Sequence, residues 1–180
     1  NMFSVKSSHF SAQIISRTAL VITMTIVLNQ IRFFKMPQGG DVGFGTMIPL
    51  ILLACCYGGR IALLAGFICG IIGLMMDPYF YHPVQVLFDY PFPYMAMAVV
   101  SIFKKRIILG TIAAFFVKFL FHFISGVVFF GSYAPEGTSP VVYSAIYNGC
   151  TVIPEIIICC LILHFLPTER IIAAMQNDSV

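Results

Sequence analysis

A chain of 180 residues in which 59% are hydrophobic and only 9% are charged has too few charged side chains to cover a soluble domain. Its mean hydropathy of +0.96 indicates an integral membrane protein. At about 20 apolar residues per transmembrane helix, plus connections, the length leaves room for about six spans. The sequence therefore predicts one membrane domain over 1–180 and excludes a fused ATPase or a separate water-soluble catalytic unit.

Charged residues and turn-forming sequences divide the chain into six apolar runs. The first run ends at the turn-forming sequence 36–41, and the third stops at Asp77-Pro78. The second turns directly into the third at Gly58-Gly59, which is too short a connection for anything but a tight helix hairpin. We predict an all-α bundle with transmembrane helices over 11–31, 42–59, 61–76, 83–103, 107–130 and 141–166, followed by a short polar tail.

The net charge of +3 is spread over the predicted loops, so it does not indicate a nucleic-acid-binding surface. With six spans both termini share a side, and seven basic residues fall on that side: Lys6, Arg17, Arg60, Lys104, Lys105, Arg106 and Arg170. Only Arg32 and Lys35 fall on the other. Because cytoplasmic loops are enriched in Lys and Arg, we expect both termini in the cytoplasm. The first apolar run is long enough to span and lacks a small-residue cleavage pattern, so no signal peptide is expected.

Ionisable side chains inside the predicted spans are the first candidates for a functional role, since such a group costs several kcal/mol unless it faces protein or water. There are four: Asp89, Lys118, His122 and Glu155. One interpretation is structural. In it Lys118 and Asp89 form an internal ion pair that fixes helix packing, while His122 and Asn148 bridge helices through hydrogen bonds. Glu155 is open to two interpretations, as a partner of Lys118 or as part of the inner wall.

The other interpretation is a binding cavity. Lys118, His122 and Gly126 are four residues apart, and Phe129-Phe130 continues the same helix face. The last span adds Asn148 and Glu155, seven residues apart, with Tyr143 and Tyr147 nearer the outer surface. A carboxylate, an imidazole, an amide and several aromatic rings suit a flat, partly cationic heteroaromatic ligand.

Enzymatic chemistry is poorly supported by the sequence. Ser125 stands three residues from His122 but has no G-x-S-x-G context and no acid placed beside it by sequence. The H-E-x-x-H motif of zinc proteases is absent. The six cysteines lie in apolar runs without C-x-x-C spacing, so we expect neither a metal nor another cofactor.

Four motifs, in order along nearly the whole chain, carry a resemblance to a known family. They are MPQGG at 36–40, HPVQ at 82–85 with DY at 89–90, HFISGVVFFGSYAPEGT at 122–138, and YS at 143–144 with YN at 147–148. In these motifs the chain resembles the thiamine-specific substrate-binding subunits, or S components, of energy-coupling factor (ECF) transporters, which are bacterial vitamin importers.

The resemblance implies a six-helix S-component bundle in the bacterial cell membrane that captures thiamine from outside the cell. It also implies partners, namely a transmembrane coupling protein and two cytoplasmic ATPases whose ATP hydrolysis drives release inward. The chain itself is then not an enzyme, in agreement with the absence of a Walker motif from the sequence.

Carried over position by position, the family's thiamine contacts fall on Asp89, Tyr90, His122, Gly126, Phe130, Tyr143 and Asn148. Asp89 is expected to contact either the aminopyrimidine or the positive charge of the thiazolium ring. Phe130 is expected to stack on the ligand, and His122 and Tyr90 to lie around the thiazolium ring. Gly126 would let a ring approach the helix backbone closely. Tyr143 and Asn148 are expected to bond polar groups of the ligand. Tyr79, Lys118, Tyr147 and Glu155 are possible supporting residues, and Ala19 and Thr23 form the small-x-x-x-small pattern of the family's docking helix.

The sequence departs from the family pattern at three places. Position 89 is Glu in some relatives, position 130 is Trp in some, and no Trp stands near Gly40. Two alternatives stay open: an S component for another vitamin or for a precursor such as hydroxymethylpyrimidine, and a structural membrane protein whose buried polar groups serve packing.

Overall fold

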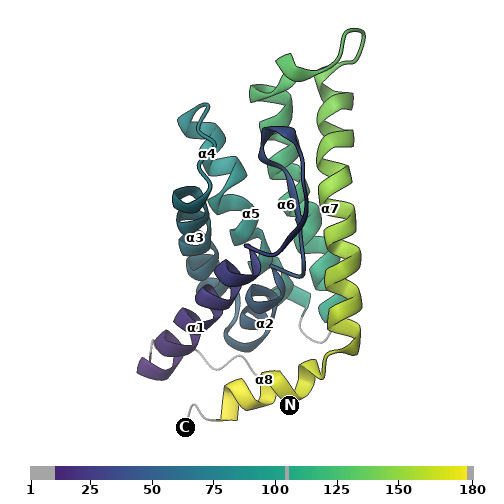
Figure 1. Ribbon diagram of the computed structural model, residues 1–180. Coiled ribbons are helices and arrows are strands. Elements are labelled where there is room, and N and C mark those ends of the chain that lie inside the picture. The colour runs from purple at the N-terminus through teal and green to yellow at the C-terminus, as the bar shows by residue number, and fades with distance from the viewer. Residues whose placement is uncertain (1–10, 104–105, 178–180) are drawn as a thin grey trace.

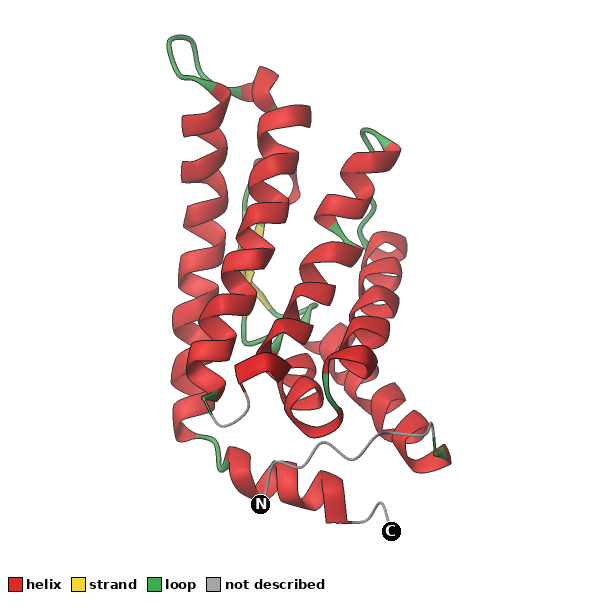
Figure 2. Ribbon diagram, turned by 180° about the vertical axis from the view of Figure 1, so that it is seen from behind, coloured by secondary structure: helices red, strands yellow, loops and turns green. Residues whose placement is uncertain are grey.

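The computed structural model describes residues 11–103 and 106–177. The basic residues Lys6, Lys104 and Lys105, on which part of the predicted orientation rests, lie outside the described residues. The chain forms an elongated helical bundle (Figures 1 and 2). The first helix begins and the last helix lies at one end of the bundle, whereas the connections 77–82 and 130–139 lie at the opposite end (Figure 1).

Within the described residues, four helical stretches are long and apolar enough to cross a membrane. They are α3 (Gly59–Met76), the stretch Pro83–Phe103, α6 (Ile107–Phe129) and α7 (Pro140–Phe165). The last two lie side by side and are joined by a loop that contains the short 3-10 helix η3 (Gly131–Tyr133) (Figure 1). The fold is that of a multi-pass membrane protein.

The first helix, α1 (Ala12–Leu28), is shorter than the predicted span 11–31. The Ser11 side chain caps it by accepting a hydrogen bond from the backbone N–H of Ile14 at 3.3 Å. Ala19 and Thr23 lie together on an exposed face, where the Thr23 hydroxyl donates to the Ala19 carbonyl.

The predicted helix 42–59 is wrong in its first third. Strand β1 (Arg32–Lys35) and strand β2 (Asp41–Gly43) form an antiparallel hairpin around the 3-10 helix η1 (Pro37–Gly39), with Lys35 opposite Asp41. Helix α2 (Ile48–Tyr57) begins only after Gly45, whose φ of +70° interrupts a helix. Hydropathy misses this hairpin because the residues of 42–47 carry no charge.

The predicted continuous helix 83–103 is also wrong in detail, since it is divided into α4 (Pro83–Asp89), α5 (Pro91–Met95) and the 3-10 helix η2 (Ala96–Phe103). Pro91 has no N–H to donate, and a proline disfavours helical geometry in the residue before it. The helix therefore breaks at Tyr90. The break leaves Asp89 and Tyr90 at a helix end.

The predicted polar tail forms a further helix, α8 (Thr168–Asn177), across the end of the bundle (Figure 1). Ile172 is buried on its inner face. The Met175 carbonyl accepts hydrogen bonds from the Tyr57 hydroxyl and the Arg17 guanidinium, both at 2.6 Å. A short, partly charged segment gives no transmembrane signal, so this helix was missed.

A tightly packed apolar core fills the half of the bundle built from α2, α3, α5 and η2. Leu50, Ile51, Leu53 and Met97 are fully buried there. Gly66 of α3 lies so close to α5 that an added Cβ would stand 2.7–2.8 Å from the backbone of Tyr94 and Met95. This close packing holds α5 against α3 and leaves α4 to face α6.

Candidate ligand-binding site

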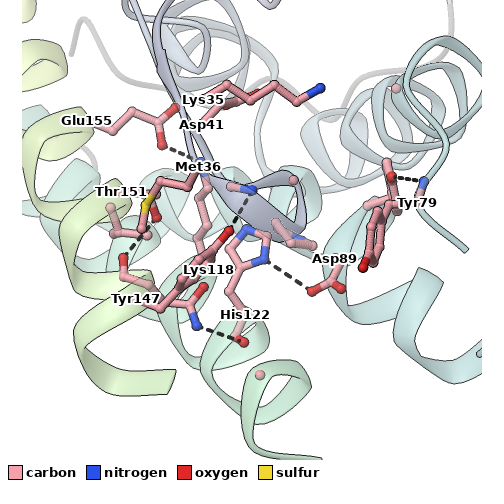
Figure 3. Close-up of a pocket in the computed structure, with 18 of the residues that line it drawn as sticks. Lys35, Met36, Asp41, Tyr79, Asp89, Lys118, His122, Tyr147, Thr151 and Glu155 are labelled. Atoms are coloured by element: carbon pink, nitrogen blue, oxygen red, sulfur yellow. Dashed lines mark hydrogen bonds and ion pairs between the residues drawn. The ribbon is translucent and has the colours of Figure 1, made fainter. Parts of the chain in front are cut away.

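A cavity of about 400 Å³ lies between the hairpin, the end of α3, and helices α4, α6 and α7. This volume is within the range of about 300–1,000 Å³ typical of small-molecule sites. Its lining includes all seven predicted contact residues and all four supporting residues. Figure 3 shows Lys118, His122, Tyr147 and Glu155 around the same space, with Asp89 facing His122. The structure thus brings together all seven contact residues and all four supporting residues.

Asp89 is in contact with three side chains. Its Oδ2 accepts hydrogen bonds from Gln85 Nε2 at 2.6 Å and from Ser125 Oγ at 2.9 Å. Its Oδ1 lies 3.4 Å from His122 Nδ1. Because two donors fix one carboxylate oxygen, the other oxygen and the imidazole are left to face a ligand.

Gln85 is a site residue to which the sequence assigned no role. Its side chain is 1% exposed and uses both ends of its amide. Oε1 accepts from the backbone N–H of Tyr81 at 3.0 Å, while Nε2 donates to the Tyr79 carbonyl as well as to Asp89. The four-residue spacing of Gln85 and Asp89 on one short helix was the signal that could have found it.

Tyr90 presents its ring rather than its hydroxyl to the cavity. The hydroxyl donates to the Asp77 carbonyl and accepts from the Tyr79 N–H, each at 2.7 Å. Close by, the Phe130 ring lies 5.7 Å from the Tyr79 ring and 5.9 Å from the Tyr81 ring, measured between centroids. Tyr79, Tyr90 and Phe130 give the cavity an aromatic wall on the side of connection 77–82, and Tyr81 packs against Phe130.

One member of the predicted aromatic stripe faces another way. Phe129 stacks on His82 at 5.2 Å between centroids and is not among the residues that line the cavity, whereas Phe130 lines it. The helix ends at Phe129, so Phe130 has left helical geometry and its side chain no longer follows the stripe's periodicity. Tyr143 and Tyr147, 5.9 Å apart between ring centroids, line the cavity from α7.

Helices α6 and α7 meet along a hydrogen-bonded seam. Asn148 Nδ2 donates to the carbonyls of His122 at 3.2 Å and Ser144 at 2.9 Å, and Ser144 Oγ donates to the Phe123 carbonyl at 2.8 Å. An added Cβ at Gly126 would overlap the Ser144 side chain. Gly126 therefore permits the close approach of the two helices, a structural reason for glycine that the sequence did not indicate.

Lys118 pairs with Glu155, with 2.5 Å between Nζ and Oε2, and both side chains are buried. The interpretation in which Lys118 pairs with Asp89 is wrong. Glu155 lies seven residues beyond Asn148 on α7, about two helical turns deeper, so the pair forms the inner end of the cavity.

The hairpin is attached to α7 at its tip. The Tyr147 hydroxyl accepts from the Gly40 N–H at 3.0 Å and donates to the Pro37 carbonyl. Tyr147 is thereby a support of the hairpin as well as a lining residue.

Ion pairs attach the other side of the hairpin to the end of α3. Asp77 Oδ2 lies 2.5 Å from Arg32 and 2.8 Å from Lys35, and Arg32 also lies 3.2 Å from Asp41. The hydrogen bond from Arg32, followed by that from Lys35, lowers the pKa of Asp77. These four residues line the cavity but were missed, because they read as loop charges in the sequence.

Ser125, His122 and Asp89 lie together but not as a catalytic triad. The Ser125 hydroxyl donates directly to Asp89 at 2.9 Å, and it is the carboxylate that lies next to His122. A nucleophilic serine needs its hydroxyl bonded to a base, with the acid behind that base. The arrangement binds and orients a carboxylate instead.

A multi-pass helical bundle with a deep, partly polar cavity defines a membrane-embedded ligand-binding protein. The family model described as "Thiamine transporter protein (Thia_YuaJ)" matches residues 15–174. The chain belongs to this thiamine transporter protein family.

Individual relatives agree with this assignment. The thiamine transporter ThiT of Bacillus subtilis (strain 168) is 35% identical over 166 residues, which cover 83% of this chain and 85% of the relative. ThiT of Lacticaseibacillus paracasei is 30% identical over 161 residues, covering 78% and 80%. The solved structure of ThiT from Listeria monocytogenes matches with a TM-score of 0.72 at 20% identity, over 92% of this chain and 94% of that one. The predicted helical membrane bundle is confirmed, with a β-hairpin added.

Proposed function

We propose that this protein captures thiamine from outside the cell as the S component of an ATP-driven ECF importer. Thiamine joins an aminopyrimidine to a permanently positive thiazolium ring. Membership of the thiamine transporter family and the identity with the ThiT proteins support thiamine as the ligand. The protein binds and releases its ligand without changing it chemically.

The surroundings of Asp89 are the observation that carries the proposal. A carboxylate that neutral donors hold in place, beside an imidazole and below aromatic rings, is suited to a flat cationic ligand. Since the side chains of His122 and Asp89 are 22% and 20% exposed, both can be reached from the cavity.

The remaining contacts follow from the geometry of the lining. Phe130 and the Tyr90 ring are the stacking surfaces, while Tyr143 and Asn148 bond polar groups of the ligand. Asn148 has donated its amide hydrogens to backbone and Ser144, and within the described residues no hydrogen bond engages its Oδ1. We assign that oxygen to an N–H of the ligand.

Release to the cytoplasm depends on partners, namely a transmembrane coupling protein and two ATPases. The exposed face of α1 with Ala19 and Thr23 is proposed as the docking surface, because small residues four apart let a partner helix pack closely. Both termini are proposed to be cytoplasmic. Co-purification of the three partners with the tagged chain tests this assembly.

Thiamine titration of the purified subunit in detergent, followed by calorimetry or tyrosine fluorescence, tests the capture function. We expect saturable, tight binding without ATP or partners. Hydroxymethylpyrimidine and riboflavin are the comparison ligands. Tighter binding of either one would assign the protein to that ligand, and binding of none would favour the structural alternative.

The variant Asp89→Ala separates binding from packing. Loss of a charged hydrogen-bonding partner should weaken thiamine binding by about 1.5–3 kcal/mol, roughly ten- to a hundredfold, with folding largely retained. Glu169→Gln removes an exposed acid on α8 and is the matched control. Unchanged thiamine affinity in Asp89→Ala would overturn the site.

A further inference from the structure

The charged residues around the cavity fall into three groups, and the positive and negative charges cancel in only two of them. At the hairpin, the cations Arg32 and Lys35 face the carboxylates Asp41 and Asp77 across 2.5–3.2 Å. Two positive and two negative side chains thus cancel at this side of the cavity.

The inner end of the cavity is balanced in the same way. Lys118 and Glu155 are 2.5 Å apart, and their side chains are only 9% and 5% exposed. The buried Phe115 ring lies with its centroid 5.3 Å from the Lys118 ammonium. Removing either member of a buried pair leaves an uncompensated charge.

Asp89 is the remaining carboxylate of the lining. Gln85 and Ser125, which donate to it, carry no charge, and His122 Nδ1 lies 3.4 Å from its other oxygen. Among the described lining residues there are therefore four carboxylates and three cations, with histidine counted as neutral. The cavity carries one net negative charge, which matches a monovalent cation.

We propose that Glu155 is the residue that sets this charge and so makes the cavity selective for free thiamine over its phosphate esters. The inference rests on the proposed function. Lys118 is one helical turn, about 6 Å along the axis, from His122, which contacts Asp89. Without Glu155 the Lys118 ammonium would compensate Asp89 and attract a phosphate group, which carries a charge of about −1.5 to −2 at pH 7.

A purely structural role for the pair is the competing explanation. However, α6 and α7 are already joined by the bonds of Ser144 and Asn148 to backbone carbonyls. A pair that served only to join the helices would not need to face the cavity, yet both Lys118 and Glu155 line it. The two explanations differ in which quantity they change: the structural one changes stability, and ours changes the preference between two ligands.

The experiment measures the affinities of thiamine and thiamine monophosphate for the wild type, Glu155→Gln and the double variant Lys118→Met/Glu155→Gln. At roughly 10 Å and an effective dielectric constant of about 20, one unit charge changes affinity by about tenfold. We expect Glu155→Gln to weaken thiamine binding and strengthen monophosphate binding, so that their affinity ratio shifts by about a hundredfold. The double variant keeps the net charge and should retain the wild-type ratio.

Two further variants keep the test decisive. Glu155→Asp retains the charge and should retain the wild-type ratio of the two affinities. Thr151→Lys adds a cation beside an intact pair and should shift this ratio in the direction expected for Glu155→Gln. It therefore tests the proposal even if Glu155→Gln fails to fold. An unchanged ratio in the folded charge variants, or an equal shift in the double variant, would overturn the role of Glu155. Failure of the wild type to bind thiamine would instead overturn the proposed function.

Discussion

The two halves of the bundle bury different kinds of side chain. The half formed by α2, α3, α5 and η2 is filled by aliphatic residues such as Leu50, Ile51 and Leu53. Most buried polar side chains belong to the other half. Of the ten found in the part of the chain that the structure describes, eight lie on α4, α6 and α7: Gln85, Thr111, Lys118, Ser125, Ser144, Asn148, Thr151 and Glu155.

This difference separates residues that stabilise the fold from residues that shape the cavity. A buried polar group in a membrane protein is costly unless it is bonded or faces water. Six of these eight residues line the cavity, and a seventh, Ser125, bonds Asp89. The apolar half is held by shape, with glycine at the points of closest approach. Substitutions in the two halves should therefore affect different measurements.

Gly66→Leu should have the largest effect, on stability. Its side chain would be forced into the backbone of Tyr94 and Met95, which cannot move aside as a flexible side chain could. Overpacking of this kind costs about 3 kcal/mol. The measurement is thermal unfolding of the detergent-solubilised protein, in which we expect a strongly lowered Tm or loss of folded material.

Gly149→Ala is the control for that variant. A Cβ at Gly149 would lie 3.8 Å from Ile153, an ordinary contact on α7. Its Tm should stay close to that of the wild type, because alanine also favours the helix. If both glycine variants lowered Tm equally, close packing of α3 on α5 would not be the cause.

Gln85→Leu should have an intermediate effect, and on binding more than on stability. It removes a donor to Asp89 and the acceptor of the Tyr81 N–H, so both the carboxylate and connection 77–82 lose their support. We expect thiamine affinity to fall by about 1–2 kcal/mol, roughly five- to thirtyfold. Titration of folded protein measures it.

Ser101→Ala removes a comparable hydrogen bond away from the cavity, since the Ser101 hydroxyl donates to the Ala98 carbonyl at 2.7 Å. Thiamine affinity should be unchanged in that variant. Equal losses in the two variants would mean that the binding assay reports general damage rather than positioning of Asp89.

The helix face that lines the cavity could be predicted from the sequence. The four-residue spacing of Lys118, His122 and Gly126 places them on one face of any helix, and the structure brings that face to the cavity. The partner of Lys118 could not be predicted, because Asp89 and Glu155 are equally plausible until the rotation of α7 is known. Their roles toward thiamine remain predictions.

The non-helical segments and the ion pairs around the cavity were missed for a different reason. The hairpin, the break at Tyr90 and the ion pairs of Asp77 depend on turns and on contacts between residues some 45 positions apart, such as Arg32 and Asp77. Hydropathy responds only to the average polarity of a segment. It therefore described 42–47 as part of a helix, although β2 and the positive φ of Gly45 preclude one there.

Asp77→Asn should have the smallest effect and extends the comparison to the cavity's outer edge. Arg32, and then Lys35, lower the pKa of Asp77 from its ordinary value of 3.8. The pair therefore stabilises the fold above the unfolded pKa, and this contribution is lost as pH falls below about 4 through the folded value. Because Asp77 is 44% exposed, screening limits the contribution to about 0.5 kcal/mol.

The difference in Tm between the wild type and Asp77→Asn, measured from pH 6 down to pH 3, isolates this contribution. We expect a small positive difference that disappears at the acidic end and also shrinks when the ionic strength is raised at pH 6. A difference that stayed constant across this range would mean that the asparagine acts through shape rather than charge. The hairpin would then be held mainly by Tyr147, whose bonds to Pro37 and Gly40 do not involve a carboxylate.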